Sequence, residues 1–260
     1  MKNVFLTGAS SGIGRATAEL LAREGHQVWG TSRDPARVAT AANIHPLRLD
    51  LGDSRSIQEA FATAQRESGG LEVVINNAGG GYFGPAEQLT NEMLQEQFQT
   101  LVFAHVELCR LAIAAMPRGL LINVTSLAAR LPVPYMAAYN AAKAAMASFT
   151  LTLQLELANT ALRIVDVQPA DISTGFNESV NRPRSDNERV NRTWEIVDKN
   201  MREAPKPELV AQRILALLQD GNPPPRVTIG GAFQAQVAPA IDQLLPQRVR
   251  LWGLRQYYGL

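Results

Sequence analysis

Short apolar runs alternate with longer stretches of helical spacing along most of this 260-residue chain. An apolar run of only a few residues, bounded by turn residues, is typical of a strand buried on both faces. The expected strands are Val4–Leu6, Val28–Trp29, Leu47–Leu49, Val73–Ile75, Leu120–Val124, Arg163–Val167 and Val227–Ile229. Because helical stretches rather than hairpin turns separate these runs, the pattern predicts an α/β fold with a parallel sheet covered by helices on both faces.

The helical stretches have recognisable ends. Asp53 is a typical N-cap, and Pro117 ends a long helix that begins near Thr90. The main predicted helices cover residues 53–64, 90–116, 136–157 and 209–218. The segment Gly175–Pro207 differs, because it is polar, rich in Arg and Asn, and poor in strong apolar positions. We expect it to be a mobile insertion that closes over a site, so that residues 1–260 form a single domain.

Composition narrows the class of protein. Hydrophobic residues make up 46% of the chain and the net charge is +1, which gives a large core but no basic field for nucleic acid. The single cysteine, Cys109, excludes an intramolecular disulfide and fits a reducing compartment. The N-terminal apolar stretch is too short for a signal peptide. The most apolar stretch, Leu101–Met116, is interrupted by charged residues, so no membrane span is expected. These features predict a cytoplasmic protein.

A glycine-rich loop follows the first expected strand. It reads Thr7-Gly8-Ala9-Ser10-Ser11-Gly12-Ile13-Gly14 and opens the first helix. Glycines at this position allow a pyrophosphate to approach backbone N–H groups at a helix N-terminus. A plain tight turn is the alternative, but the place of the loop between strand and helix favours a dinucleotide site.

The end of the second strand is where such sites distinguish the two nicotinamide dinucleotides. An acidic residue there binds a ribose 2′-hydroxyl, whereas an arginine accommodates a 2′-phosphate. This chain has Ser32 and Arg33, a hydroxyl donor and a cation suited to phosphate. Asp34 precedes Pro35 and is expected to cap the next helix. The sequence therefore favours NADP(H) over NAD(H), although a solvated Arg33 is the alternative.

Three residues suggest proton-transfer chemistry. Tyr139 and Lys143 are four residues apart on the alanine-rich helix and share one face. An ammonium group near a phenol favours phenolate and lowers its pKa, which makes a tyrosine usable as a proton donor or acceptor. Ser126 follows the fifth strand, at the carboxyl edge of the sheet, where it can orient a carbonyl oxygen. A lone Tyr-x-x-x-Lys pair is weak evidence, but the three residues and the glycine loop together predict a hydride-transfer enzyme.

Taken in order, these motifs resemble those of the short-chain dehydrogenase/reductase family over nearly the whole chain. The resemblance implies a Rossmann-like, doubly wound parallel sheet of about seven strands. It also implies catalytic roles for Ser126, Tyr139 and Lys143, with Lys143 also holding the nicotinamide ribose. By the same resemblance, the cofactor contacts would be Thr7, Gly8, Ser10, Ser11, Gly12, Ile13, Gly14, Ser32, Arg33, Asp50, Leu51, Asn77, Ala78, Gly79, Tyr139, Lys143, Pro169, Ile172 and Thr174.

Two positions depart from the family pattern. Leu101 stands where the family has a catalytic asparagine that steadies a water beside the lysine, and leucine has no polar atom for that water. Ala170 replaces the glycine that usually follows Pro169. Both changes bear on the rate more than on the type of reaction.

The sequence thus predicts an NADP(H)-dependent oxidoreductase that transfers hydride between the nicotinamide and a carbonyl or alcohol, with a weak preference for lipophilic substrates. The alternative is a catalytically weak NADP(H)-binding sensor or regulatory protein. By the family resemblance, the two long helices would pair across a homodimer or homotetramer interface. The three histidines show no metal-ligand spacing, so no metal is expected. Arg182, Arg184, Arg189 and Arg192 could bind an anionic substrate, but a solvated loop face is the stronger interpretation. Trp252, Tyr257 and Tyr258 could seal an apolar pocket or a subunit contact, or simply pack a C-terminal tail.

Overall fold

A parallel sheet of seven strands forms the centre of the computed structural model, which describes the backbone of residues 1–260 and all side chains except those of residues 242 and 243. The strand order is β3-β2-β1-β4-β6-β7-β9, and every neighbouring pair is parallel. The strands are β1 (Asn3–Leu6), β2 (Gln27–Ser32), β3 (Ile44–Arg48), β4 (Val73–Asn76), β6 (Arg118–Val124), β7 (Ala161–Pro169) and β9 (Arg226–Ile229). The predicted Rossmann-like, doubly wound sheet is confirmed.

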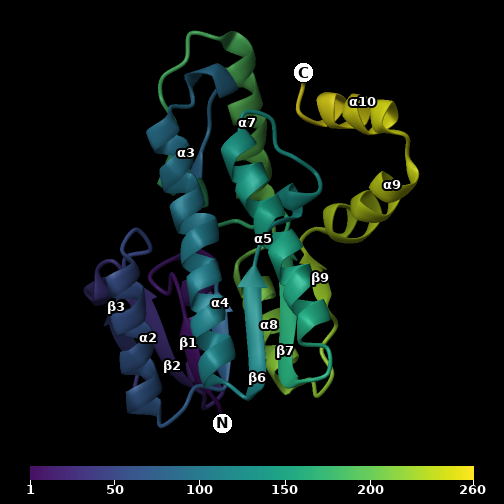
Figure 1. Ribbon diagram of the computed structural model, residues 1–260. Helices are drawn as coiled ribbons and strands as arrows, with labels where there is room; N and C mark the ends of the chain where they lie inside the picture. The colour runs from purple at the N-terminus through teal and green to yellow at the C-terminus, as the bar shows by residue number, and fades with distance from the viewer.

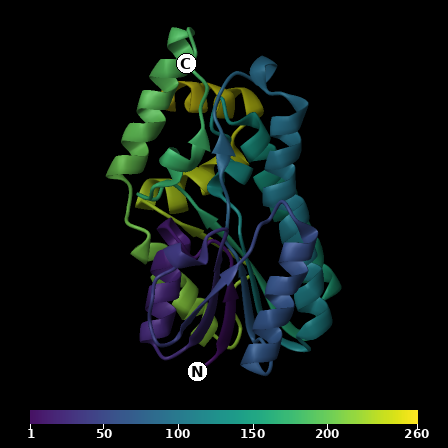
Figure 2. The same cartoon turned by 90° about the vertical axis from the view of Figure 1, so that its left-hand side faces the viewer.

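Helices cover both faces of this sheet, as the side view in Figure 2 shows. One face carries α1 (Gly12–Arg23) and α8 (Glu208–Gln219), which pack against each other. The other carries α2 (Ser54–Ser68), α4 (Ala104–Ala115) and α5 (Ala137–Glu156). The apolar strand residues are buried between these two layers, which explains why the strands show continuous apolar runs rather than alternation.

The third strand differs from the prediction by a few residues. It was expected at Leu47–Leu49, but β3 spans Ile44–Arg48 and pairs with β2 from Val28↔Ile44 to Ser32↔Arg48. The strand contains Pro46, which sequence rules place only at a sheet edge, and β3 is an edge strand. Because β3 has an exposed side, two of its five residues, His45 and Arg48, are polar, and the apolar run underestimates its length.

The predicted long helix forms as one continuous element that contains a π-helical turn. It begins at α3 (Asn91–Phe98), where the Thr90 side chain accepts a hydrogen bond from the backbone of Met93, and ends with α4. Between them lies a π-helical turn, Gln99–Phe103. By length and composition the whole helix, Asn91–Ala115, could cross a membrane, a property that core helices of soluble proteins share. This is weak evidence for a span, and the expectation of none stays a prediction.

The segment 175–207 is folded onto the carboxyl edge of the sheet. It contains α6 (Phe176–Ser179), β8 (Val180–Asn181) and α7 (Glu188–Glu203), and β8 pairs with β5 (Gly81–Tyr82) in a separate two-stranded sheet. Residues after β9 form a C-terminal arm, which we define as residues 233–260. It consists of a π-helical turn (Phe233–Val237), α9 (Ala238–Leu244) and α10 (Gln247–Tyr257). Figure 1 shows the arm in yellow, standing beside α5 and α7.

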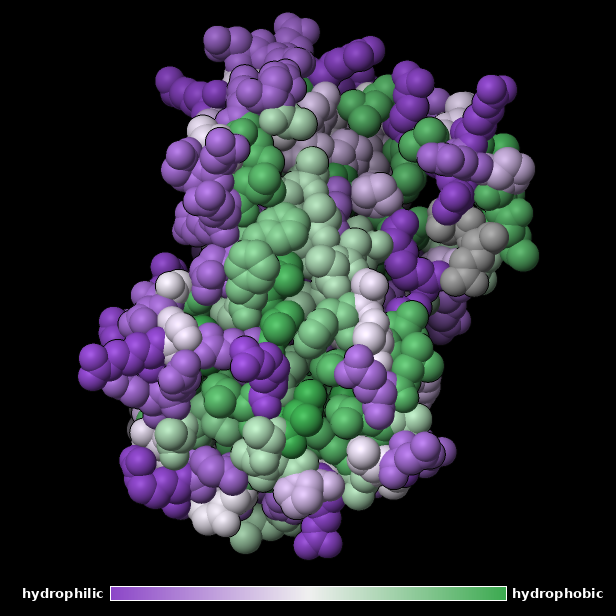
Figure 3. Space-filling view, viewed as in Figure 1, coloured by the Kyte–Doolittle hydropathy of each residue, from purple (hydrophilic) through white to green (hydrophobic). Residues whose placement is uncertain are grey.

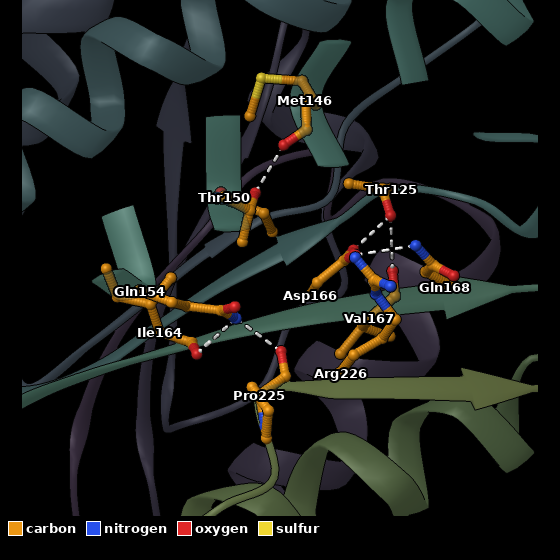
Figure 4. A network of polar contacts seen from close by, with 11 residues as sticks. Thr125, Met146, Thr150, Gln154, Ile164, Asp166, Val167, Gln168, Pro225 and Arg226 are labelled. Atoms are coloured by element: carbon orange, nitrogen blue, oxygen red, sulfur yellow. Dashed lines mark hydrogen bonds and ion pairs between the residues drawn. The ribbon is translucent and has the colours of Figure 1, made fainter. Parts of the chain in front are cut away.

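A buried acidic residue ties the last strand to the sheet. Asp166 on β7 is 1% exposed, and its Oδ2 lies 3.0 Å from Nε of Arg226 on β9. Gln168 Nε2 donates to the same oxygen at 2.8 Å, and the Thr125 hydroxyl donates to Oδ1. Figure 4 shows these side chains converging between β6, β7 and β9. A buried carboxylate without such partners would be costly, so this network fixes the register of three strands.

Candidate active site

The glycine loop joins β1 to α1 and can form only with glycine at three of its positions. Gly8 and Gly12 have positive φ angles of 73° and 52°, a conformation that other residues rarely adopt. A Cβ on Gly14 would lie 2.1 Å from the carbonyl oxygen of Gly8, so the first turn of α1 touches the loop backbone directly. The loop therefore leaves the N-terminal N–H groups of α1 accessible from the carboxyl edge of the sheet, where a phosphate binds.

β1 and β4 flank the point where the strand order reverses, which is where open α/β sheets bind ligands. Thr7 lies at this point, fully buried, and its Oγ1 accepts hydrogen bonds from the backbone N–H groups of Asn77 at 2.9 Å and Ala78 at 3.0 Å. Asn77 Nδ2 returns a hydrogen bond to the Thr7 carbonyl at 2.9 Å. Thr7 is not among the residues that line the cleft, and its side chain supports two residues that do, Asn77 and Ala78. A contact between Thr7 and the cofactor stays a prediction.

The adenosine end of the predicted cofactor site lies at the end of β2. Ser32 is half-buried, and Arg33 is exposed. The Asp34 side chain accepts from Ala36 N and caps the short 3-10 helix Pro35–Arg37, which confirms its expected capping role. Ser32 and Arg33 both line the cleft, whereas Asp34 is not part of its lining. Arg37 lines the cleft beside them and is a second cation that the sequence did not single out.

Ser126, Tyr139 and Lys143 come together at the carboxyl edge, although they belong to two elements. Ser126 follows β6 and caps the 3-10 helix Leu127–Ala129 by accepting from Ala128 N at 3.1 Å. Tyr139 and Lys143 lie one turn apart on α5, and Lys143 Nζ is 5.8 Å from the Tyr139 ring centroid. Lys143 is 4% exposed, and its Nζ donates to the Val124 carbonyl at 2.9 Å. The connecting loop is held by Asn140, whose Nδ2 donates to the Val133 carbonyl at 2.8 Å.

Electrostatics at this cluster differ from the prediction in one respect. Burial raises the pKa of Tyr139 above its ordinary value, while the Ser126 hydroxyl acts in the opposite direction and Asp171 adds to the rise. The predicted lowering of the Tyr139 pKa is therefore wrong for the protein without a bound ligand, because the loss of hydration around the phenol is the largest effect. Burial also lowers the pKa of Lys143 to about 8, against an opposing effect of Asp166. The raised pKa of Tyr139 favours a protonated phenol at neutral pH.

Leu101 occupies the place predicted for it, next to the lysine. It is fully buried in the π-helical turn, and its Cδ2 lies 3.1 Å from where a Cβ of Gly79 would be, with Lys143 Nζ 3.9 Å from that same point. One turn further on, His105 is 2% exposed, and its Nε2 has no hydrogen-bond partner among the described residues. The apolar side chain of Leu101 therefore occupies space near Lys143.

The second departure is accommodated by a neighbour. The Ala170 N–H donates to the Ile229 carbonyl at 2.7 Å, which aligns this segment with the end of β9. A Cβ on Gly230 would lie 2.6 Å from the Ala170 methyl group. Glycine at 230 therefore provides the space that alanine at 170 takes.

One cleft of about 1120 Å³ connects these groups. Its lining includes every residue predicted for the site except Thr7. The segment 175–207 reaches the cluster through Phe176, whose ring centroid is 5.7 Å from that of Tyr139. Of the last aromatic residues, Tyr257 and Tyr258 line the cleft, whereas Trp252 is 64% exposed on the opposite side of α10.

Sequence reasoning missed a group of hydrogen-bonded polar residues in the lining of the cleft. Asp171, after β7, accepts a hydrogen bond from Gln234 of the C-terminal arm, and Gln234 Nε2 also lies 2.8 Å from the Tyr257 hydroxyl. Asn200 of α7 donates to that hydroxyl at 3.1 Å. Burial raises the pKa of Asp171, and Gln234 partly offsets the rise. These residues are distant in sequence and share no local pattern, so only the fold brings them together.

Neither an anion site formed by Arg182, Arg184, Arg189 and Arg192 nor a metal site is found among the described residues. Arg182 stacks over the Trp194 ring at 5.0 Å from Cζ to the centroid, which agrees with a loop-packing role. Among the described residues, none of the four arginines lines the cleft, and no group of three or more His, Cys, Asp or Glu side chains could hold a metal. The expectation of no metal stays a prediction.

The residues of the cleft fit a nicotinamide dinucleotide. The glycine cradle at the N-terminus of α1 would clash with any Cβ at position 14, the backbone of Asn77–Gly79 forms the floor, and Lys143 is buried at the other end. Ser126 and Tyr139 lie beyond that floor, so a phosphate-binding loop and a proton donor share one cleft. This arrangement defines a dinucleotide-dependent oxidoreductase.

Comparison with known proteins specifies the family. Residues 2–185 match the short chain dehydrogenase family. The chain is 32% identical to 3-ketodihydrosphingosine reductase from Bacteroides thetaiotaomicron, over 99% of this chain and 98% of the relative. It is also 32% identical to an NADPH-dependent 1-acyldihydroxyacetone phosphate reductase from Schizosaccharomyces pombe, over 66% of this chain and 60% of that one. A short-chain dehydrogenase from Streptomyces avermitilis superposes with a TM-score of 0.84 at 25% identity, covering 98% of this chain and 96% of that chain. The protein belongs to the short-chain dehydrogenase/reductase family, whose oxidoreductases act on carbonyl or alcohol groups.

Proposed function

We propose that this protein uses NADP(H) to interconvert a lipophilic ketone and its alcohol. The observation that carries the proposal is the continuity of the cleft. Ser126 and Tyr139 line the cleft. The same cleft is also lined by Leu245, Val249 and Leu254, which are apolar residues of the C-terminal arm. An apolar wall beside a proton donor suits a substrate that has a polar carbonyl and a hydrocarbon chain.

Two of the relatives support this substrate class. The names 3-ketodihydrosphingosine reductase and 1-acyldihydroxyacetone phosphate reductase both denote enzymes that reduce lipid ketones. The first of them matches this chain along almost its entire length, the C-terminal arm included. The C-terminal arm forms the apolar wall of the cleft. Sequence similarity to this relative that includes the arm therefore favours a substrate of similar shape.

The roles of the chain's own residues follow from their positions. Bound NADPH would supply the hydride for the carbonyl carbon. Tyr139, whose raised pKa keeps it protonated at neutral pH, donates its phenolic proton to the carbonyl oxygen. Ser126 donates a hydrogen bond to the same oxygen and orients it. Lys143 stabilises the phenolate that remains and, by the family resemblance, holds the nicotinamide ribose.

Preference for NADP(H) is inferred from the end of β2. Arg33 and Arg37 are exposed cations on the cleft wall, and the Ser32 hydroxyl lies with them. The one acidic residue in this turn, Asp34, is engaged in capping. A 2′-phosphate would meet two cations here, and Asp34, the carboxylate that could accept from a 2′-hydroxyl, is not among the residues that line the cleft.

We further propose that the protein works as a homo-oligomer in the cytoplasm. Phe103, the last residue of the π-helical turn before α4, is exposed, as are Leu151 and Leu155 on α5, and Figure 3 shows an apolar stripe over α4 and α5. A symmetric pairing of this stripe would bury it. The only cysteine of the chain is buried as a free thiol, which fits a reducing compartment.

A substrate-length series tests the function. Oxidation of NADPH is followed at neutral pH with 3-ketodihydrosphingosine, a medium-chain methyl ketone and acetone. We expect kcat/KM to rise with chain length, because each buried methylene contributes about 0.8 kcal/mol. Tyr139→Phe removes only the proton donor and should lower kcat at least about a hundredfold.

The matched control is Tyr135→Phe, which removes the hydroxyl of a tyrosine that lies outside the lining of the cleft. It should retain wild-type kinetics. Tight NADPH binding without turnover of any ketone by the wild type would overturn the proposal and leave a binding or sensing role.

A further inference from the structure

Exposed apolar side chains are concentrated on the C-terminal arm. Among the described residues, nine of the fifteen large apolar side chains that are exposed lie between Phe233 and Tyr257. Leu244 is 85% exposed, Leu251 52% and Trp252 64%. Such a concentration on one short segment is unusual for a soluble surface and indicates an interaction site.

The two sides of α10 have different surroundings. Arg250, Gly253, Leu254 and Tyr257 follow the i, i+3, i+4, i+7 spacing of one helix face, and all four line the cleft. Arg248, Leu251, Trp252 and Arg255 follow the same spacing on the other face, and all four are exposed. The helix therefore separates the cleft from the exterior and presents an apolar pair between two arginines to solvent.

Charge distinguishes between the partners that could cover this face. Residues 244–260 contain three arginines and no aspartate or glutamate. A tryptophan and leucines flanked by arginines form the pattern of a helix that lies in the interface of a bilayer with anionic headgroups. Figure 3 shows hydrophilic and apolar residues side by side over the arm, at the upper right.

We propose that the outer face of α10, together with Leu244, docks on the surface of an anionic phospholipid bilayer. In this orientation the arginines contact headgroup phosphates while Leu244, Leu251 and Trp252 enter the boundary of the acyl region. The cleft lies on the opposite side of the same helix, so a lipophilic substrate has a short path from bilayer to cleft. Docking of this kind is peripheral and reversible, since a single short helix buries little apolar area.

This surface differs from the apolar stripe over α4 and α5. On the stripe, Phe103, Leu151 and Leu155 are exposed, and the helices are rich in small residues, which suits close packing of two protein copies. The outer face of α10 instead has cations at both ends of an apolar pair. Two copies meeting through this face would bring their arginines together, which opposes self-association.

Vesicle sedimentation tests the proposal without any turnover. The purified full chain is mixed with vesicles of phosphatidylcholine alone or with about one quarter phosphatidylglycerol. We expect the wild type to pellet with the anionic vesicles at about 0.1 M salt and to be released at about 1 M salt. The double variant Leu251→Ser/Trp252→Ser should lower the partition constant at least about tenfold. Arg248→Gln/Arg255→Gln should lower it by about tenfold or more, on anionic vesicles only.

Matched controls are Leu209→Ser, which alters an exposed leucine on α8, and Arg23→Gln/Arg66→Gln, which removes two exposed arginines elsewhere. They should bind vesicles as the wild type does. Equal circular dichroism spectra and equal thermal unfolding midpoints for all variants show that the fold is intact.

Two results would overturn the proposal. One is wild-type protein that stays in the supernatant with both kinds of vesicle, or that pellets equally with both. The other is a fall in molecular mass by light scattering in Leu251→Ser/Trp252→Ser, which would assign the face to a second copy of the chain. Neither outcome depends on whether the protein reduces a lipophilic ketone.

Discussion

Ser32 and Arg33 determine, at the scale of single side chains, which dinucleotide the cleft should prefer. Removing both in Ser32→Ala/Arg33→Ala should weaken NADPH binding by about 10- to 100-fold, because charge-assisted hydrogen bonds to phosphate contribute about 1.5–3 kcal/mol. NADH affinity should hardly change, since NADH has no 2′-phosphate. Fluorescence titration with each dinucleotide measures the ratio, and Arg23→Ala on α1 serves as the control. Comparable wild-type affinity for both dinucleotides would contradict the assignment.

His105 gives a prediction about pH and stability. Burial, with a smaller contribution from Lys143, lowers the pKa of His105 to about 3 in the folded protein. An unfolded histidine titrates near 6.5, so between these values the unfolded chain binds more protons, and stability falls as the pH drops below about 6.5. From pH 7 to pH 5 this contribution amounts to about 2 kcal/mol.

In His105→Gln, the difference in unfolding free energy between pH 7 and pH 5 should shrink by that amount. Urea denaturation at the two pH values measures it. A histidine is neutral in both states at higher pH, so the comparison between pH 7 and pH 8.5 is the internal control. An unchanged slope below pH 7 would show that His105 is not held neutral by burial.

At this scale the sequence predicted Tyr139 and Lys143 because their spacing on a helix is local, and it predicted Ser126 from its position after the fifth strand, at the carboxyl edge of the sheet. Arg37, Asp171 and Gln234 could not be found in that way. Asp171 and Gln234 are 63 residues apart and meet only because β9 returns the chain to the end of β7. The support that Thr7 Oγ1 gives to Asn77 and Ala78 was not predicted either, because sequence does not show which side of a loop a short side chain faces.

At the scale of elements, the junction between β1 and α1 is the least tolerant part of the site. Gly14→Ala places a Cβ 2.1 Å from the Gly8 carbonyl oxygen and 2.6 Å from Asn77 Nδ2, so the loop must move away from the helix. We expect a loss of about 1–3 kcal/mol of unfolding free energy, the usual range for overpacking. Dinucleotide affinity should fall at least about tenfold, as the N–H groups of α1 lose their alignment.

Urea denaturation and a dinucleotide titration measure the two effects. Gly221→Ala is the matched control, because a Cβ there has open space and the residue has no positive φ. Wild-type affinity in Gly14→Ala would show that the loop tolerates a side chain and that its tight approach to α1 is not required.

The elements themselves followed largely from periodicity. Strands buried on both faces gave apolar runs, the predicted cap at Asp53 is present, and the long helix begins at Asn91, close to the predicted start near Thr90. The π-helical turn Gln99–Phe103 was not predicted, because an extra residue in one helical turn leaves no characteristic residue type in the sequence. β3 was misplaced by a few residues because an edge strand needs apolar residues on one side only.

For the whole molecule, the apolar stripe over α4 and α5 leads to a prediction of assembly. Leu155 is 72% exposed on α5, and Leu151, one turn earlier, is 48% exposed. If the stripe pairs two copies, Leu151→Arg/Leu155→Arg should convert the oligomer to monomer, because four arginines would be buried facing one another. Light scattering gives the mass. Leu209→Arg on α8 is the control, and an unchanged mass in the double variant would exclude this interface.

The sequence by itself determined the parallel sheet, the glycine loop, the cluster of Ser126, Tyr139 and Lys143, and the departure at Leu101. These depend on patterns that repeat within a few residues or on motifs kept in a fixed order. Only the tertiary structure decided that Thr7 braces the loop from below, that Tyr139 has a raised pKa before any ligand binds, and that the C-terminal arm forms one wall of the cleft. Those properties arise from burial and from contacts between distant segments. How much hydration a side chain loses depends on all the segments that pack around it, so no single sequence position reveals it.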